Sequence, residues 1–192
     1  SDVKEIGTTT KRGTVITFKP DETIFTTTEY RYEILSTRLR ELAFLNKGIN
    51  LTIKDNREEE ENGSGKHFRE DRFYSEKGLR EFVEFLDGTR EKLVQDVIYL
   101  DTEKNDIPVE IALSYNTSFT ENVHTYVNNI NTIEGGTHLA GFRRGLTRTL
   151  KTYAEKSGLL SKLKFDISGD DFREGLTAVI SVKVQEPQFE GQ

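Results

Sequence analysis

Apolar and polar residues alternate over several short segments of the chain, and this period of two predicts β-strands. The clearest case is 109–115, where Val109, Ile111, Leu113 and Tyr115 would share one face of a sheet. The further predicted strands lie at 13–18, 49–54, 97–101, 119–128, from Lys164 onward, and 176–184. Asn105-Asp106 and Asn116-Thr117 have the composition of turns between such strands.

Apolar residues at helical spacing predict three helices between these strands. The first begins near Thr26, which has a capping-box partner in Glu29, and stops at Asn46-Lys47-Gly48. The second carries an apolar stripe and ends at Asp87-Gly88; its stripe consists of Leu79, Phe82, Val83 and Leu86. The third and longest follows Gly135-Gly136 and runs over 137–156. A short acidic helical turn is expected at 170–174.

Strands with interspersed helices predict an α/β fold, here an α+β two-layer sandwich. A natural junction near the second helix divides the chain into domains at 1–76 and 77–192. The segment 57–66 combines four consecutive glutamates with Gly63 and Gly65, which predicts a mobile hairpin loop. Adjacent carboxylates without a glycine-centred ligand loop rarely chelate, so no cation site is expected there.

Composition narrows the class of protein. The 192 residues are 34% apolar and contain no apolar run long enough to span a membrane, so we expect a soluble cytoplasmic protein. There is no cysteine, and His67, His124 and His138 lack ligand spacing, so no metal site is expected. Because the chain lacks methionine and opens on polar residues, it is interpreted as part of a longer protein. A net charge of −6 restricts any DNA contact to a local basic patch.

The longest predicted helix carries that patch. It holds several cations against a single acid, Glu155; these cations are Arg143, Arg144, Arg148, Lys151 and Lys156. At 100° per residue, the apolar stripe contains Leu139, Phe142, Leu146, Leu150 and Tyr153. Arg144, Arg148 and Lys151 fall on the opposite face, with Arg143 at the border of the stripe. The pattern fits either an ordinary solvated helix face or contacts to phosphate, which would be blind to base sequence.

Four segments resemble the ATPase subunits of the bacterial type II topoisomerases, DNA gyrase and topoisomerase IV. They are Gly13-Thr14, Leu39-Arg40-Glu41-Leu42-Ala43-Phe44-Leu45-Asn46, Glu134-Gly135-Gly136-Thr137-His138-Leu139-Ala140-Gly141-Phe142-Arg143, and Gly169-Asp170-Asp171-Phe172-Arg173-Glu174-Gly175-Leu176 leading to Ser181-Val182-Lys183-Val184. Their order and spacing extend over nearly the whole chain. The residues of segment 39–46 and of Thr147-Arg148-Thr149-Leu150 favour gyrase over topoisomerase IV.

The resemblance implies an architecture and a set of site residues. It implies a remnant of a GHKL ATPase domain over 1–76 and, over 77–192, a transducer domain with a ribosomal-protein-like split β-α-β fold. Thr14 would bond near the adenine of ATP, Gln192 would reach its terminal phosphate, and Arg143 would line a cavity that DNA passes through. The catalytic and magnesium-binding residues of the family precede this chain. The complete enzyme would use ATP and magnesium, whereas the fragment alone is expected to bind neither and to be inactive.

The function implied is mechanical coupling, in which ATP binding closes a gate for DNA during negative supercoiling. The implied partners are DNA, the A protein of gyrase in an A2B2 complex and a second copy of the B protein. Two alternatives remain at this point: the corresponding protein of topoisomerase IV, which decatenates DNA, and a stand-alone nucleic-acid-binding module of the same fold. A small-metabolite kinase would need Gly135-Gly136-Thr137 as its phosphate loop, and no acidic ligand or base is positioned beside it.

Overall fold

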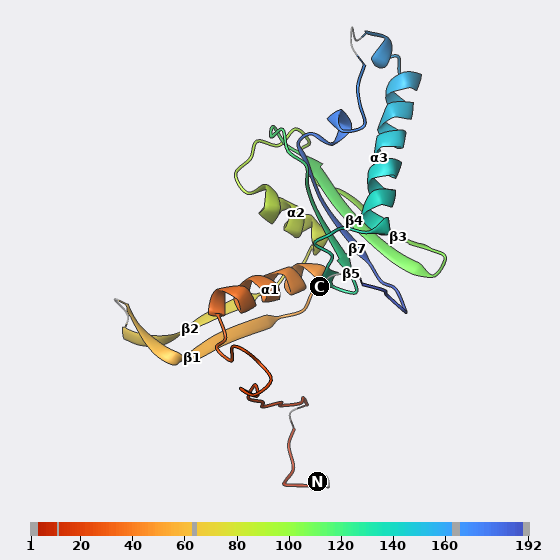
Figure 1. Ribbon diagram of the computed structural model, residues 1–192. Helices are drawn as coiled ribbons and strands as arrows, with labels where there is room; N and C mark the ends of the chain where they lie inside the picture. Colours follow the sequence, from red (N-terminus) through yellow and green to blue (C-terminus); the bar gives the residue numbers. More distant parts are fainter. Residues whose placement is uncertain (1–3, 11, 63–64, 163–165, 190–192) are drawn as a thin grey trace. The chain divides into compact units, whose positions relative to one another are not determined.

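The computed structural model describes residues 4–10, 12–62, 65–162 and 166–189, and the chain divides into two compact units at Arg31/Tyr32 (Figure 1). The first unit contains a tight turn, in which the carbonyl of Asp21 accepts from the amides of Ile24 and Phe25 at 3.1 and 2.9 Å. The carboxylate of Asp21 accepts from the amide and hydroxyl of Thr23 at 2.8 and 2.7 Å. These two bonds hold the pKa of Asp21 below its usual value.

Two predictions for the first unit are wrong. The segment 13–18 forms no strand, and Val15, Ile16 and Phe18 are largely exposed. A strand requires a neighbour for its backbone hydrogen bonds, and among the described residues none pairs with this segment. The first helix begins at Tyr32 rather than near Thr26, so the apparent capping box is not used.

The second unit opens with helix α1 (Tyr32–Leu45) and an antiparallel ribbon of β1 (Leu51–Asn62) and β2 (Gly65–Phe73). Helix α1 ends where expected, and Gly48 adopts a left-handed φ of 85° behind it. The helix is tied to the ribbon by Asp71, which accepts from the hydroxyls of Tyr32 and Ser36 at 3.1 and 3.2 Å.

The predicted loop over 57–66 is wrong in extent. Strand pairing continues to Asn62↔Gly65, with one irregularity between Lys54 and Glu59, and residues 63–64 lie outside the described part. A charged, glycine-containing sequence argues against burial. It does not prevent two backbones from pairing in an antiparallel ribbon, because the ladder bonds require only extended chains.

A five-stranded sheet forms the body of the second unit. Its order is β3-β4-β7-β5-β6, and its strands are β3 (Ile98–Lys104), β4 (Ile107–Tyr115), β5 (Asn122–Val127), β6 (Ile130–Asn131) and β7 (Leu176–Val182). β5 and β7 are immediate neighbours and parallel, joined by the crossover that contains α3 (Thr137–Lys156), whereas the other pairs are antiparallel. The β-α-β unit and the mixed α/β class are therefore as predicted.

Helices cover both faces of this sheet (Figure 1). On one face, α2 (Leu79–Asp87) and the end of α1 pack on the sheet, and the buried cluster there comprises Leu45, Leu79, Phe82, Val83, Ala112, Tyr126 and Val179. On the other face, Phe142 and Leu146 of α3 pack on Leu113, Leu176 and Ala178. The predicted two-layer packing describes α3 on the sheet, and α2 adds a layer on the opposite side. Every residue of β7 is consequently buried.

The turns and short elements complete the unit. Asn105 and Asp106 both have left-handed φ angles, 53° and 59°, as a two-residue hairpin turn requires, so that prediction is confirmed. The turn at Asn128-Asn129 and strand β6 were not predicted. Two short 3₁₀ turns are present, η1 (Leu160–Lys162) and η2 (Asp171–Arg173). The strand predicted from Lys164 falls partly outside the described residues, and from Asp166 on no strand forms before β7.

The predicted boundary at 76/77 lies within one shared core. Phe44 and Leu45 precede it and pack with Leu79 and Phe82, which follow it. The division into domains at 1–76 and 77–192 therefore stays a prediction. Among the described residues, none of the helices combines the length and the hydrophobicity that a membrane-spanning segment needs.

Candidate nucleic-acid interface

Helix α3 presents its cations away from the sheet. Phe142 and Leu146 face the core, whereas Arg144, Arg148 and Lys151 are exposed. Their spacing of four and three residues aligns the three side chains along one face. Within the described ranges none of the three takes part in an ion pair, so their charges are available to an anionic partner. Tyr153 is exposed rather than part of the apolar stripe.

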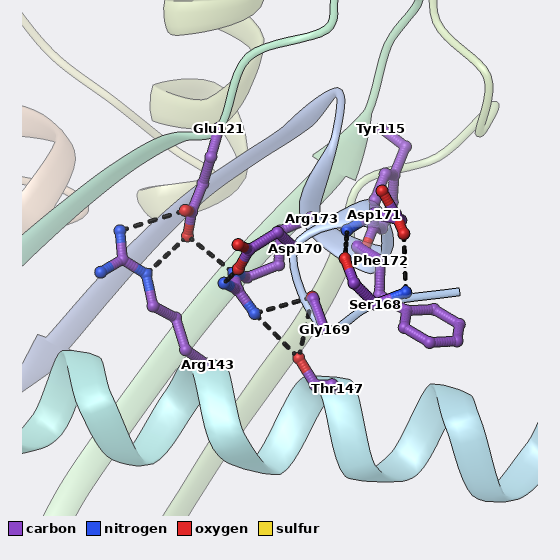
Figure 2. A network of polar contacts seen from close by, with 10 residues as sticks. All are labelled: Tyr115, Glu121, Arg143, Thr147, Ser168, Gly169, Asp170, Asp171, Phe172 and Arg173. Atoms are coloured by element: carbon purple, nitrogen blue, oxygen red, sulfur yellow. Dashed lines mark hydrogen bonds and ion pairs between the residues drawn. The ribbon is translucent and has the colours of Figure 1, made fainter. Parts of the chain in front are cut away.

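Arg143 differs from its three neighbours because it is already paired. Its Nε and Nη2 donate to the two carboxylate oxygens of Glu121 at 2.7 and 3.1 Å, the bidentate geometry typical of arginine–carboxylate pairs (Figure 2). The two side chains are 41% and 22% exposed, so the pair lies at the surface. That Arg143 lines a cavity for DNA stays a prediction, and one edge of its guanidinium is engaged by Glu121.

A second arginine shares that carboxylate. Arg173 of η2 lies between Glu121 and α3, with its Nε 3.5 Å from the same Glu121 oxygen that Arg143 Nε contacts (Figure 2). Its Nη1 donates to Thr147 Oγ1 at 3.0 Å and to the carbonyl of Gly169 at 2.8 Å, and its Nη2 pairs with Asp170. Arg173 is only 15% exposed. Its contacts to Thr147 and Glu121 join η2 to α3 and to the segment before β5.

Further bonds fix η2 against the sheet. The hydroxyl of Tyr115 at the end of β4 donates to the carbonyl of Phe172 at 2.7 Å, and burial raises the pKa of Tyr115. The amide of Ser168 donates to Asp171 at 2.6 Å, and this bond, with one from the Ser168 hydroxyl, lowers the pKa of the Asp171 carboxyl. These bonds hold η2, which ends at Arg173, against the end of β4.

Glu121 and Arg173 were missed as site residues by the sequence analysis. Glu121 lies 22 residues before Arg143, and Arg173 is further still along the chain, so no local spacing could reveal the contact. Arg173 does stand in one of the segments that carry the family resemblance, which was the only available signal.

The two predicted nucleotide contacts are not brought together in the described residues. Thr14 is exposed in the first unit, and Gln192 lies outside the described residues. In the part of the chain that the structure describes, no group of three or more His, Asp or Glu side chains is arranged so that it could hold a metal ion. His124 and His138 are partly buried, which lowers the pKa of each, and His138 contacts the hydroxyl of Thr132 at 3.0 Å.

Arg143→Gln should reduce the free energy of unfolding by no more than about 1 kcal/mol, because an ion pair that is partly open to solvent contributes little. Arg173 remains beside Glu121 in the variant, so the carboxylate is not left without a cation. Urea denaturation of the 192-residue chain measures the effect. A loss of several kcal/mol would show that the pair behaves as a buried one.

The chain is similar to DNA gyrase B proteins, both in a comparison with family models and in a comparison with individual proteins. The family model described as DNA gyrase B matches residues 78–192. The gyrase B protein of Cytophaga hutchinsonii is 63% identical over 191 residues, which is 100% of this chain and 39% of that protein. The gyrase B protein of Staphylococcus epidermidis is 53% identical over 192 residues, 100% of this chain and 29% of the relative. The chain thus spans about two fifths or less of these relatives' length.

Solved structures show the same likeness. The 43K ATPase domain of Thermus thermophilus gyrase B, solved with an aminocoumarin, aligns with a TM-score of 0.74 at 33% identity, over 90% of this chain and 45% of that one. The topoisomerase IV ATP-binding domain of Francisella tularensis aligns with a TM-score of 0.63 at 27% identity, over 90% of this chain and 44% of that one. The mixed α/β fold therefore agrees with that of known ATPase regions.

Proposed function

Because the chain belongs to the DNA gyrase B family, we propose that it is part of the ATPase subunit of a DNA gyrase and couples nucleotide state to DNA transport. In this proposal the complete protein works in the cytoplasm with the A protein of gyrase, a second copy of itself and DNA. It binds ATP and magnesium mainly through residues outside this chain, and this chain contributes Thr14 and Gln192. By itself the chain is expected to be inactive.

The coupling is proposed to run through the second unit. Residues 1–76 would complete the ATPase domain and 77–192 would act as the transducer. A contact that Gln192 makes only when ATP is present adds free energy to one arrangement of the transducer and not to another. Such a difference is what a ligand needs in order to shift a conformational equilibrium. Hydrolysis of ATP removes the contact, and the equilibrium between the two arrangements returns to its position without ATP.

The observation that carries the proposal is the exposed row of Arg144, Arg148 and Lys151 on α3, which forms no ion pair within the described residues, in a chain whose net charge is −6. A cationic row on a helix face can contact phosphates, which carry no base-sequence information, so it can hold any DNA segment. The row lies inside the region that matches the gyrase B family model, at 78–192. Sequence-blind contact suits a duplex that is transported rather than read.

Replacing Arg144, Arg148 and Lys151 together with glutamine should weaken the binding of DNA to the complete protein. The log–log salt dependence should flatten by about three units, one for each phosphate that is no longer bound. Supercoiling by the reassembled enzyme should fall, while ATP turnover without DNA should persist. The matched control replaces three exposed lysines outside α3 with glutamine, namely Lys47, Lys77 and Lys104. Equal losses in both triple variants would reduce the effect to net charge and defeat the proposal.

Topoisomerase IV is the second candidate, because the topoisomerase IV domain of Francisella tularensis aligns with 90% of this chain. The two activities differ in product. Gyrase introduces negative supercoils into relaxed circular DNA, whereas the alternative would separate linked circles without supercoiling them. Assaying the complete enzyme on both substrates decides between them.

A further inference from the structure

Glu121 is the unusual member of the network in Figure 2, because one of its oxygens faces two arginines. Its Oε1 accepts from Arg143 Nε at 2.7 Å and lies 3.5 Å from Arg173 Nε. The two distances are unequal: the first is a hydrogen bond, and the second is an ion-pair contact too long to be a good one. Glu121 therefore favours Arg143 in the absence of another anion.

Arg173 is left with an unmet bond. Its Nε is buried and has no hydrogen-bond partner among the described residues, whereas its other nitrogens bind Thr147, Gly169 and Asp170. A buried donor without a partner is destabilising, and the Glu121 oxygen that accepts from Arg143 lies 3.5 Å from this Nε. A shift of Glu121 toward Arg173 would satisfy this donor.

We infer that Glu121 exchanges between Arg143 and Arg173: when a DNA phosphate takes Arg143, Glu121 closes on Arg173 and so links DNA capture to the start of β7. The inference rests on the proposed function, since it assumes that α3 meets DNA. Arg143 is the more exposed partner and has a guanidinium edge that can turn to a phosphate. The exchange offsets the loss of its carboxylate contact, because Glu121 keeps a cation and Arg173 gains a bond.

The consequence reaches β7 through short, direct contacts. Arg173 ends η2, which Tyr115 fixes to β4 through the carbonyl of Phe172. Two residues later, the carbonyl of Gly175 accepts from the amide of Asn116 at 2.9 Å, and β7 begins at Leu176. Glu121 is thus a positioning residue with two alternative partners, one facing solvent and one attached to the central strand.

The test uses Glu121→Gln in the complete protein, with linear double-stranded DNA as the probe. A neutral amide competes less for Arg143, so the DNA concentration at half-saturation should fall about threefold. The amide also attracts Arg173 less, so maximal DNA-stimulated ATP turnover should fall about threefold. Tighter binding combined with weaker stimulation is a signature that simple loss of structure does not produce.

Three further variants complete the experiment. Glu155→Gln makes the same charge change on an exposed acid of α3 and should leave both parameters near the wild-type values. In an Arg143→Gln background, Glu121→Gln should no longer tighten DNA binding, because the two changes act on one contact. Arg173→Lys keeps the charge but cannot offer Glu121 the Nε donor that offsets the departure of Arg143, so it should lower stimulation and raise the DNA concentration at half-saturation, which tests the link should Glu121→Gln melt early.

The outcomes separate the exchange from the proposed function. Glu121→Gln that weakens DNA binding, that leaves both parameters unchanged, or that acts equally without Arg143 overturns the exchange alone, provided that the α3 triple variant still loses DNA. A triple variant that binds DNA normally refutes the proposed function, and the exchange falls with it.

Discussion

Gly175→Ala is expected to reduce the free energy of unfolding by about 4 kcal/mol or more, the range of substitutions that break a backbone constraint. Gly175 has a left-handed φ of 73°, where a side chain is strained. A Cβ built there would lie 2.2 Å from the backbone oxygen of Asn116 and 3.0 Å from that of Ser118. Backbone cannot move aside as a flexible side chain can.

The neighbourhood of Gly175 increases the expected loss. Asn116 is buried, and its side-chain amide donates to Asp87 at 2.8 Å and to Thr177 at 3.2 Å, which joins the end of α2 to the start of β7. Displacing the Asn116 backbone disturbs all of these bonds together. Urea denaturation of the 192-residue chain, followed by circular dichroism, measures the loss.

Gly145→Ala is the matched control. Gly145 lies inside α3, and a Cβ there meets nothing within 4 Å. The same chemical change should therefore stabilise the chain by about 0.5–1 kcal/mol, since alanine forms helix better than glycine. If both variants unfold at the wild-type midpoint, the close approach of Gly175 to Asn116 is not a feature of the folded protein.

Phe82→Ala is expected to destabilise the chain by about 3–5 kcal/mol, the range for removing a buried aromatic ring. Phe82 is 2% exposed, and its ring stacks on Phe44 of α1 at 5.0 Å and lies 5.9 Å from the ring of Tyr126 in β5. The residue therefore connects α1, α2 and the sheet in one core. Thermal and urea unfolding should both report the loss as a single transition.

Phe85→Ala, on the same helix, provides the comparison. Phe85 is 51% exposed, although it also contacts Phe44 at 5.6 Å. Its removal should reduce the free energy of unfolding by about 1 kcal/mol, as for a largely solvated ring. A Phe82→Ala variant that loses only the α1 region, with the sheet intact, would show that the core divides near the predicted boundary at 76/77.

The elements predicted well are those whose signal is local and repeated. Helix α3 matches its predicted range because 20 residues carry one apolar stripe after two glycines. The hairpin at Asn105-Asp106 was predictable because both residues tolerate left-handed φ. In contrast, the alternation at 13–18 describes a strand that has no neighbour in the described chain, and pattern alone cannot supply one.

The candidate site likewise has one part that could be predicted from the sequence and one part that could not. The exposure of Arg144, Arg148 and Lys151 follows from helix geometry, so it could be predicted. The bidentate pair of Arg143 could not, because Glu121 reaches it from the segment before β5 only after the sheet has formed. Tertiary contacts between residues far apart in sequence leave no period in either segment.

The place of β7 in the sheet has a consequence for biosynthesis. β7 lies between β4 and β5, yet it is the last strand of the sheet along the chain. While a ribosome is still adding α3, β4 and β5 each present an unpaired edge that is otherwise covered in the finished protein. Open strand edges bind other chains readily, and pairings between distant segments form slowly. The nascent protein therefore passes through an interval of aggregation risk that ends only when residues 176–182 leave the exit tunnel and enter the gap.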